Sequence, residues 1–156
     1  MCEGRFKGGP IVTKLVLRGF GLKAVRFPVA EGEAIVSNSP ISFLGNVDPE
    51  TGVIQNHPLE GKSIAGRVFV FPTGVGSTVG TYVIINLAEK GLAPKAIIQR
   101  KADTVTLIGA VVAGIPLIHR VTPDPVESIR TGDWVRVDSS KGLIEVERNK
   151  GGWESG

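Results

Sequence analysis

The decapeptide Phe71-Pro72-Thr73-Gly74-Val75-Gly76-Ser77-Thr78-Val79-Gly80 ends one apolar run and opens the next through a glycine-rich turn. The run before it, Arg67 to Phe71, is rich in β-branched and aromatic residues and stops at Pro72. This composition, closed by a proline that a strand interior does not tolerate, predicts a buried strand. The chain is therefore expected to leave the end of a strand through a Gly-x-Gly turn.

A helix is predicted directly after this turn, from Val79 to Lys90. Ser77 or Thr78 can cap its first turn, and Gly91 can take the left-handed conformation that ends many helices. Apolar residues within it recur with helical spacing, at Val79, Val83 and Leu87.

A second short strand is predicted at Lys95 to Gln99. A strand, a helix and a strand in sequence imply a right-handed crossover between two parallel strands. The turn between the first strand and the helix then gathers backbone N–H groups at the positive end of a helix dipole. Anions bind at such a point.

The rest of the chain is predicted to complete one α/β domain over residues 1–156, with a mixed sheet or barrel-like β core. Gly19 and Gly21 are expected to end the first strand, and residues 1–10, with the Gly8-Gly9-Pro10 turn, and 149–156 to be flexible. An apolar stretch, Val105 to Gly114, is expected to precede a further strand. The remaining elements are strands at Ile11–Leu17, Glu33–Ser37 and Ile115–His119, a helical turn at Val126–Ile129, and a hairpin of Trp134–Asp138 and Leu143–Glu147.

Composition narrows the function. The 156 residues are 42% hydrophobic and 21% charged, as expected for a globular chain. A domain of this size buries about 70% of the surface that its unfolded chain exposes. No apolar run approaches about 18 residues and no signal peptide is recognised, so we expect a cytoplasmic protein without a membrane contact. The 18 basic residues are scattered, which argues against a nucleic-acid surface. A single cysteine, Cys2, and two distant histidines, His57 and His119, indicate no metal site in this chain.

Two nucleotide-binding motifs do not match the glycine turn. A P-loop needs a lysine directly before its serine or threonine, whereas Gly76 stands directly before Ser77 in this chain. The Rossmann fingerprint needs Gly-x-Gly-x-x-Gly, and Gly80 lies one residue too far along the chain. The next strand also ends in Gln99-Arg100 rather than in an acidic residue that would hold a ribose.

Ser77 has three possible roles. It can simply cap the helix; it can act as a nucleophile, although no histidine lies near it in the sequence; or its alkoxide, stabilised by backbone donors, can act as a proton-abstracting base. The two histidines are expected to be structural or surface residues. No motif selects a phosphate ligand among Arg67, Lys62 and Arg100.

Four segments, taken in order, carry a family resemblance. They are Ile41-Ser42-Phe43-Leu44-Gly45-Asn46-Val47-Asp48-Pro49-Glu50-Thr51-Gly52, His57-Pro58-Leu59-Glu60-Gly61-Lys62-Ser63, Phe71 to Thr78, and Pro94-Lys95-Ala96-Ile97. In this order they resemble the small subunit of aconitase X-type hydro-lyases, and the resemblance covers most of Glu31 to Glu147.

The resemblance implies a single aconitase-swivel-like β/α/β domain that works as one half of a heterodimer. Members of this family dehydrate small molecules at a subunit interface, with a [4Fe-4S] cluster held by three cysteines of the large subunit. By the same resemblance Ser77 is the proton acceptor, with Gly76 and Thr78 helping to position the substrate. Aconitase continues its serine motif with an arginine for a substrate carboxylate, but here Val79 follows Thr78. That contact must therefore come from backbone donors or from the partner.

The substrate stays open at this point. Archaeal-type members convert mevalonate 5-phosphate to trans-anhydromevalonate 5-phosphate on a route to isoprenoids, and related two-chain enzymes dehydrate cis-3-hydroxy-L-proline. Two other classes remain: an autonomous anion- or nucleotide-binding module, and a non-catalytic subunit whose turn only docks a partner. The residues expected to contact substrate are Gly74, Val75, Gly76 and Thr78 of the turn, and Ser42, Asn46 and Asp48 of a loop that can close over the cleft or merely form a surface turn.

Overall fold

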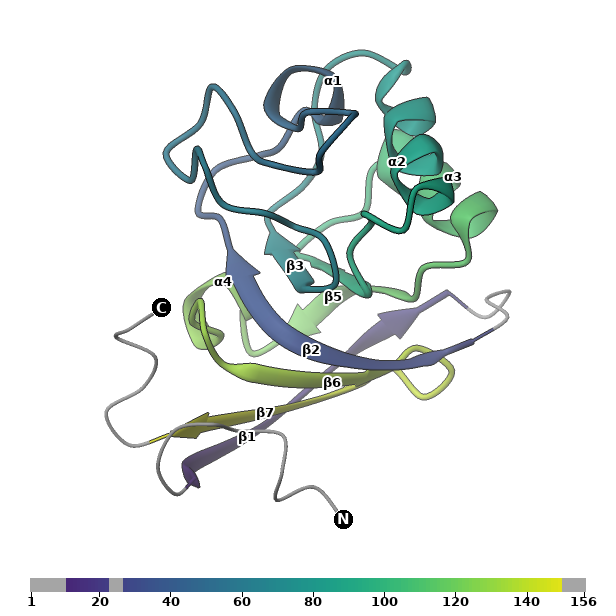
Figure 1. The fold of residues 1–156 in the computed structure, drawn as a ribbon. Coiled ribbons are helices and arrows are strands. Elements are labelled where there is room, and N and C mark those ends of the chain that lie inside the picture. The colour runs from purple at the N-terminus through teal and green to yellow at the C-terminus, as the bar shows by residue number, and fades with distance from the viewer. Residues whose placement is uncertain (1–10, 23–26, 150–156) are drawn as a thin grey trace.

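The structure is a computed structural model that describes residues 11–22 and 27–149. The segments 1–10 and 150–156, predicted to be flexible, lie outside the described residues, as do Cys2 and the Gly8-Gly9-Pro10 turn. The described residues form seven strands that close into a barrel in the order β1-β5-β4-β3-β2-β6-β7 (Figure 1). The strands are β1 Ile11–Gly21, β2 Val29–Val36, β3 Val68–Phe71, β4 Ala96–Gln99, β5 Leu117–Thr122, β6 Trp134–Asp138 and β7 Leu143–Asn149. The predicted α/β class with a barrel-like mixed sheet is confirmed.

Four of these strands run parallel. β2, β3, β4 and β5 pair in that order, with Val70 of β3 opposite Ile98 of β4. Every residue of β3 and β4 is buried, which explains why both read as continuous apolar runs. The helices that connect and follow these strands are α1 Phe43–Asn46, α2 Gly80–Glu89, α3 Thr104–Ala113 and α4 Pro125–Ser128. The predicted crossover from β3 through α2 to a parallel β4 is thus confirmed, and the apolar stretch near 105–114 forms helix α3.

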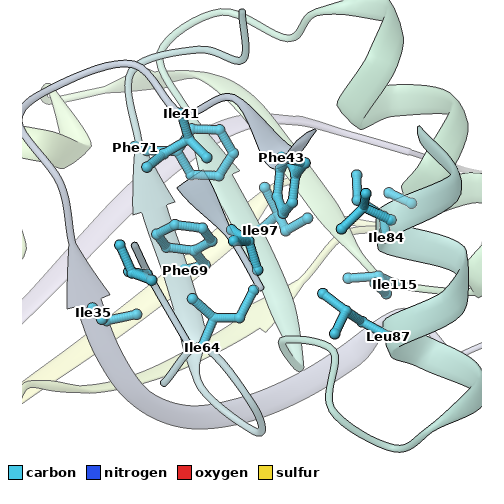
Figure 2. Packing of buried hydrophobic residues seen from close by; sticks show 14 of the residues in the cluster. Ile35, Ile41, Phe43, Ile64, Phe69, Phe71, Ile84, Leu87, Ile97 and Ile115 are labelled. Carbon is cyan, nitrogen blue, oxygen red and sulfur yellow. The ribbon is translucent and has the colours of Figure 1, made fainter. Parts of the chain in front are cut away.

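Apolar side chains fill two layers. One cluster lies within the barrel, and the other lies between the parallel strands and helices α1 to α3. Figure 2 shows the second cluster, in which Phe43 of α1 meets Phe69 and Phe71 of β3. The Phe43 ring stands edge-on to both rings, with centroids 6.2 and 6.0 Å away. Each buried phenyl group contributes about 1.5–3 kcal/mol, so α1 is held against the strand that leads into the glycine turn.

Several predicted boundaries were wrong. β1 does not stop at Leu17 but continues through Gly19 and ends at Gly21, because these glycines permit close strand contact. A Cβ atom at Gly19 would lie 2.6 Å from the His119 carbonyl oxygen, and one at Gly21 would overlap the backbone of Ser139. At the other end of the chain, Asn149 was expected in the flexible tail but pairs with Ile11 as the last residue of β7. β2 begins at Val29 rather than Glu33, and β5 continues beyond His119 to Thr122.

Candidate active site

The glycine turn lies where three parallel strands end. The segment after β2 carries Ser42, the segment after β3 carries Ser77, and the segment after β4 carries Asp103. Because neighbouring parallel strands end at the same edge of a sheet, these three segments meet there, at the edge where α/β sheets usually bind ligands. A bridge between Ile41 and Gly74 joins the first two segments directly. The turn residues 75–79 are exposed at the surface.

The start of α2 differs in detail from the prediction. Its N-cap is Val79, which offers no side-chain hydrogen bond, and Val79 is 48% exposed instead of packing in the core. Ser77 instead binds the N-cap residue itself, because its Oγ accepts a hydrogen bond from the Val79 amide at 3.1 Å. The Gly80 amide donates to the Ser77 carbonyl oxygen at 3.0 Å, which makes the first turn tight. The predicted C-terminal signal is confirmed, since Gly91 has φ +73° directly after the C-cap Lys90.

Three consecutive amides of the turn are available to a ligand. Within the described part of the chain, the N–H groups of Gly76, Ser77 and Thr78 donate no hydrogen bond. The neighbouring amides are occupied: Val75 donates to the Ile41 carbonyl oxygen at 2.9 Å, and Val79 donates to Ser77. Successive unpaired N–H groups at the positive end of a ten-residue helix favour a negative charge. Ser77 is the middle residue of these three donors.

Asp103 is a site residue that the sequence reasoning missed. Its carboxylate accepts a hydrogen bond from the Gly74 amide at 2.7 Å, one from Gln99 Nε2 at 2.8 Å and one from the Thr106 amide at 2.9 Å. The last of these caps helix α3. An aspartate before an apolar run of helical length is a recognisable capping signal, but its contact with a residue 29 positions away has no local signature.

Ser42 lies against Gly76. A Cβ atom at Gly76 would sit 2.6 Å from Ser42 Oγ, and Gly76 has φ +91°, a conformation that favours glycine. Ser42 also caps α1, since its Oγ accepts from the Gly45 amide at 3.3 Å. Of the three predicted loop residues, Ser42 is therefore the one that the fold brings to the turn.

Asn46 and Asp48 use their side chains within the loop. Asn46 Oδ1 accepts from the Ser42 amide at 2.8 Å, and its Nδ2 donates to the carbonyl oxygens of Gln55 and Asn56. Asp48 Oδ1 accepts from the Glu50 amide at 2.8 Å, the pattern of an Asx turn. Asn46 thus fixes the backbone of Ser42, whereas Asp48 shapes the turn that follows.

The two histidines make contacts away from Ser77. His57 Nδ1 accepts from the Leu59 amide at 3.1 Å, and its Nε2 lies 3.2 Å from Ser37 Oγ. Burial lowers the pKa of His57 below its ordinary value of 6.5. His119 stands edge-on to Phe20, and its pKa is lowered by burial and by the charge of Arg120. Both side chains therefore favour the neutral form.

Two further observations concern metals and membranes. Over residues 11–22 and 27–149, no three His, Cys, Asp or Glu side chains gather as a metal site would require. Within the same residues, no helix has both the length and the apolar composition needed to cross a membrane.

Comparison with known proteins gives consistent matches. Residues 22–146 match the family model described as the aconitase X swivel domain. The chain is 48% identical over 124 residues to the phosphomevalonate dehydratase small subunit of Methanosarcina acetivorans, covering 78% of this chain and 86% of that protein. It is 50% identical over 120 residues to the protein of the same name from Thermococcus onnurineus, covering 76% and 90%. The holo-form crystal structure of Thermococcus kodakaraensis aconitase X superposes with a TM-score of 0.77 at 46% identity, covering 85% of this chain and 98% of the other.

Proposed function

We propose that this chain, which belongs to the aconitase X swivel-domain family, is the small subunit of a phosphomevalonate dehydratase. The sequence resemblance had predicted both the family and its swivel-type fold. The relatives of that name are 45–50% identical over about three quarters or more of this chain. The proposed reaction is the loss of water from mevalonate 5-phosphate to give trans-anhydromevalonate 5-phosphate, in an archaeal-type route to isoprenoids.

Ser77 is the proposed base. The observation that carries this role is the place of Ser77, an exposed residue whose hydroxyl accepts from the Val79 amide at the start of α2. The Val79 amide and the positive end of the α2 dipole stabilise the alkoxide, which takes a proton from the carbon next to the one that loses its hydroxyl group. The C–H electron pair then forms the double bond as the hydroxyl departs. A positioned base typically contributes 10²- to 10⁴-fold in rate.

The partner is a large subunit that completes the site. In the proposed cytoplasmic heterodimer, a [4Fe-4S] cluster in that subunit supplies a Lewis acid for the departing hydroxyl. In this proposal the cysteine ligands of the cluster come from the partner, as in the family that the chain resembles; over residues 11–22 and 27–149 of this chain no three His, Cys, Asp or Glu side chains gather. This chain contributes the base and the donors around it, and the substrate lies between the subunits.

The amides of Gly76, Ser77 and Thr78 are the proposed contacts for an anionic group of the substrate. They can replace the arginine that follows the serine motif of aconitase, because consecutive backbone donors at a helix start bind carboxylate or phosphate. Ser42, which lies against Gly76, adds a hydroxyl to the same edge. Gly74 and Val75 hold the backbone that carries these groups, through Asp103 and Ile41 respectively.

Reconstitution tests this function. The chain is combined with a cysteine-bearing large subunit and iron, and water loss is measured with mevalonate 5-phosphate and with cis-3-hydroxy-L-proline. We expect no turnover by the chain alone and turnover of the phosphorylated acid by the complex. Turnover of hydroxyproline alone would reassign the substrate.

The unpaired amides also favour a second candidate, an autonomous anion- or nucleotide-binding module. Calorimetric titration of the isolated chain with nucleotides separates the two functions. Micromolar nucleotide binding by the isolated chain, with no activity of the complex on either substrate, would support the binding module instead.

A further inference from the structure

We propose that Asp103 is a positioning residue for Ser77, with Gln99 as its support. The inference rests on the proposed role of Ser77 as the base. Asp103 lies at the start of α3 and holds the far side of the glycine turn, so that the exposed amides and the serine hydroxyl keep one orientation toward the substrate.

The first argument is the number of donors on one carboxylate. An aspartate that only caps a helix needs one oxygen for one amide, and Asp103 Oδ2 does this with Thr106. Its Oδ1 accepts instead from the Gly74 amide at 2.7 Å and from Gln99 Nε2 at 2.8 Å. Neither of these contacts adds to the cap. They connect the end of β4 and the start of α3 to the turn that carries Ser77.

The second argument is the close approach at Gly74. A Cβ atom there would lie 2.5 to 2.7 Å from the carboxylate atoms of Asp103, so the carboxylate occupies the space of a side chain. The turn is fixed at Gly74 by Asp103 and at Val75 by the Ile41 carbonyl oxygen. From Gly76 to Thr78 the backbone amides have no partner within the described residues. The orientation of Ser77 therefore depends on the two anchors before it and on the helix after it.

The third argument is the burial of Gln99. Its side chain is fully buried, yet its Oε1 has no hydrogen-bond partner among the described residues. The unpaired buried acceptor costs about as much as the bond from Nε2 to the carboxylate returns, so a leucine of similar volume should serve folding equally well. Among the described residues, the hydrogen bond that the Gln99 side chain makes is the one its Nε2 donates to Asp103. A buried polar group that gains no net stability while it orients another group is typical of a functional site.

The experiment uses the full chain reconstituted with its large subunit, and kcat and KM are measured per assembled complex. For Asp103→Ala we expect kcat to fall about 100-fold, because a displacement of about 1 Å can cost that much, with KM changed less than threefold. For Asp103→Asn, which keeps one acceptor oxygen, kcat should lie between the values for wild type and for Asp103→Ala. Asp124→Ala is the matched control, because Asp124 also caps a helix and carries a two-point ion pair with Arg100. It should lower the melting temperature and keep kcat within twofold.

Gln99→Leu is the second variant, because a loss of activity in Asp103→Ala could also result from unfolding. We expect its melting temperature to equal or exceed that of wild type while kcat falls severalfold, a combination that a purely structural role does not produce. Hydrogen exchange measured in the complex gives a reading independent of substrate: the Gly74 amide should exchange faster in Asp103→Ala than in wild type.

The outcomes separate this inference from the proposed function. If Ser77→Ala abolishes turnover but Asp103→Ala and Gln99→Leu keep wild-type kcat, only the positioning role is overturned. If Ser77→Ala keeps full turnover, the serine base is refuted and the positioning role is refuted with it. Unchanged exchange of the Gly74 amide in Asp103→Ala would also overturn the inference.

Discussion

Replacing Gly76 by alanine should impair catalysis far more than an equivalent change elsewhere. Gly76 has φ +91°, which costs a residue with a side chain about 1–2 kcal/mol. The new Cβ would lie 2.6 Å from Ser42 Oγ and must displace it. Loss of that Ser42 cap adds about 1 kcal/mol. The variant should therefore be destabilised by about 2–3 kcal/mol, and the turn should shift where it carries Ser77.

Gly61 provides the matched control. It has φ +95°, and a Cβ atom there would have no heavy atom within 4 Å. Gly61→Ala should carry the conformational cost alone, so the two variants should differ by about 1 kcal/mol, or about 2–4 °C in melting temperature for a chain of this size. In the reconstituted complex, Gly76→Ala should lower kcat about 100-fold because Ser77 is displaced, and Gly61→Ala should leave it within twofold.

Thermal unfolding and steady-state kinetics of both variants check the reasoning. A double variant isolates the contact: with Ser42→Ala, the hydroxyl is absent and only the Ser42 Cβ, 3.2 Å away, remains near the new methyl group. The stability loss of the double variant should be about 1 kcal/mol smaller than the sum of the single losses. Equal kcat values for Gly76→Ala and Gly61→Ala would refute the account of the turn.

Two other predictions concern charge. Arg148 donates two hydrogen bonds, of 2.9 and 2.8 Å, to Asp133, which is only 2% exposed. Arg148→Met should therefore lower the free energy of unfolding, measured with denaturant, by about 3–5 kcal/mol. Arg100→Met, at the exposed ion pair with Asp124, should lower it by at most about 1 kcal/mol. Equal losses would contradict the burial argument. Burial lowers the pKa of His57 and of His119 below 6.5, so the folded chain binds fewer protons than the unfolded chain. Stability should be full above about pH 7 and should fall as the pH decreases through 6.5 toward 5. In His57→Gln, the melting temperature should fall less steeply over this pH range. An unchanged slope in that variant would exclude His57 as a source.

Local sequence patterns predicted the elements that the turn connects. The strand before Pro72, the helix after the turn and the strand ending at Gln99 all have strong local signals, because burial and helical spacing are properties of short segments. The serine in the turn was noted from the sequence, and the family resemblance then favoured the base among its possible roles. The β6–β7 hairpin was predicted for the same reason, since alternation and a four-residue turn are local.

Contacts between distant segments could not be predicted in this way. Asp103 was missed because its bond to Gly74 depends on the parallel pairing of β3 and β4, which places the segments after both strands at one edge. Gly19 and Gly21 were taken as strand ends because glycine usually interrupts strands; β1 does end at Gly21, but it continues through Gly19, where the missing side chain allows close approach to the His119 backbone. Asn46 and Asp48 were selected for their polar groups, and only the fold shows that their hydrogen bonds lie within the loop.

The central claim, that Ser77 is the base, is tested most directly by Ser77→Ala in the reconstituted complex. Ser63→Ala is a close control, because Ser63 Oγ accepts from the Ala65 amide at 3.1 Å, the same bond that Ser77 Oγ makes with Val79. The account predicts that kcat falls at least about 100-fold in Ser77→Ala, with assembly unchanged, and stays within twofold of wild type in Ser63→Ala. Turnover by Ser77→Ala equal to that of Ser63→Ala would show that Ser77 only shapes the turn.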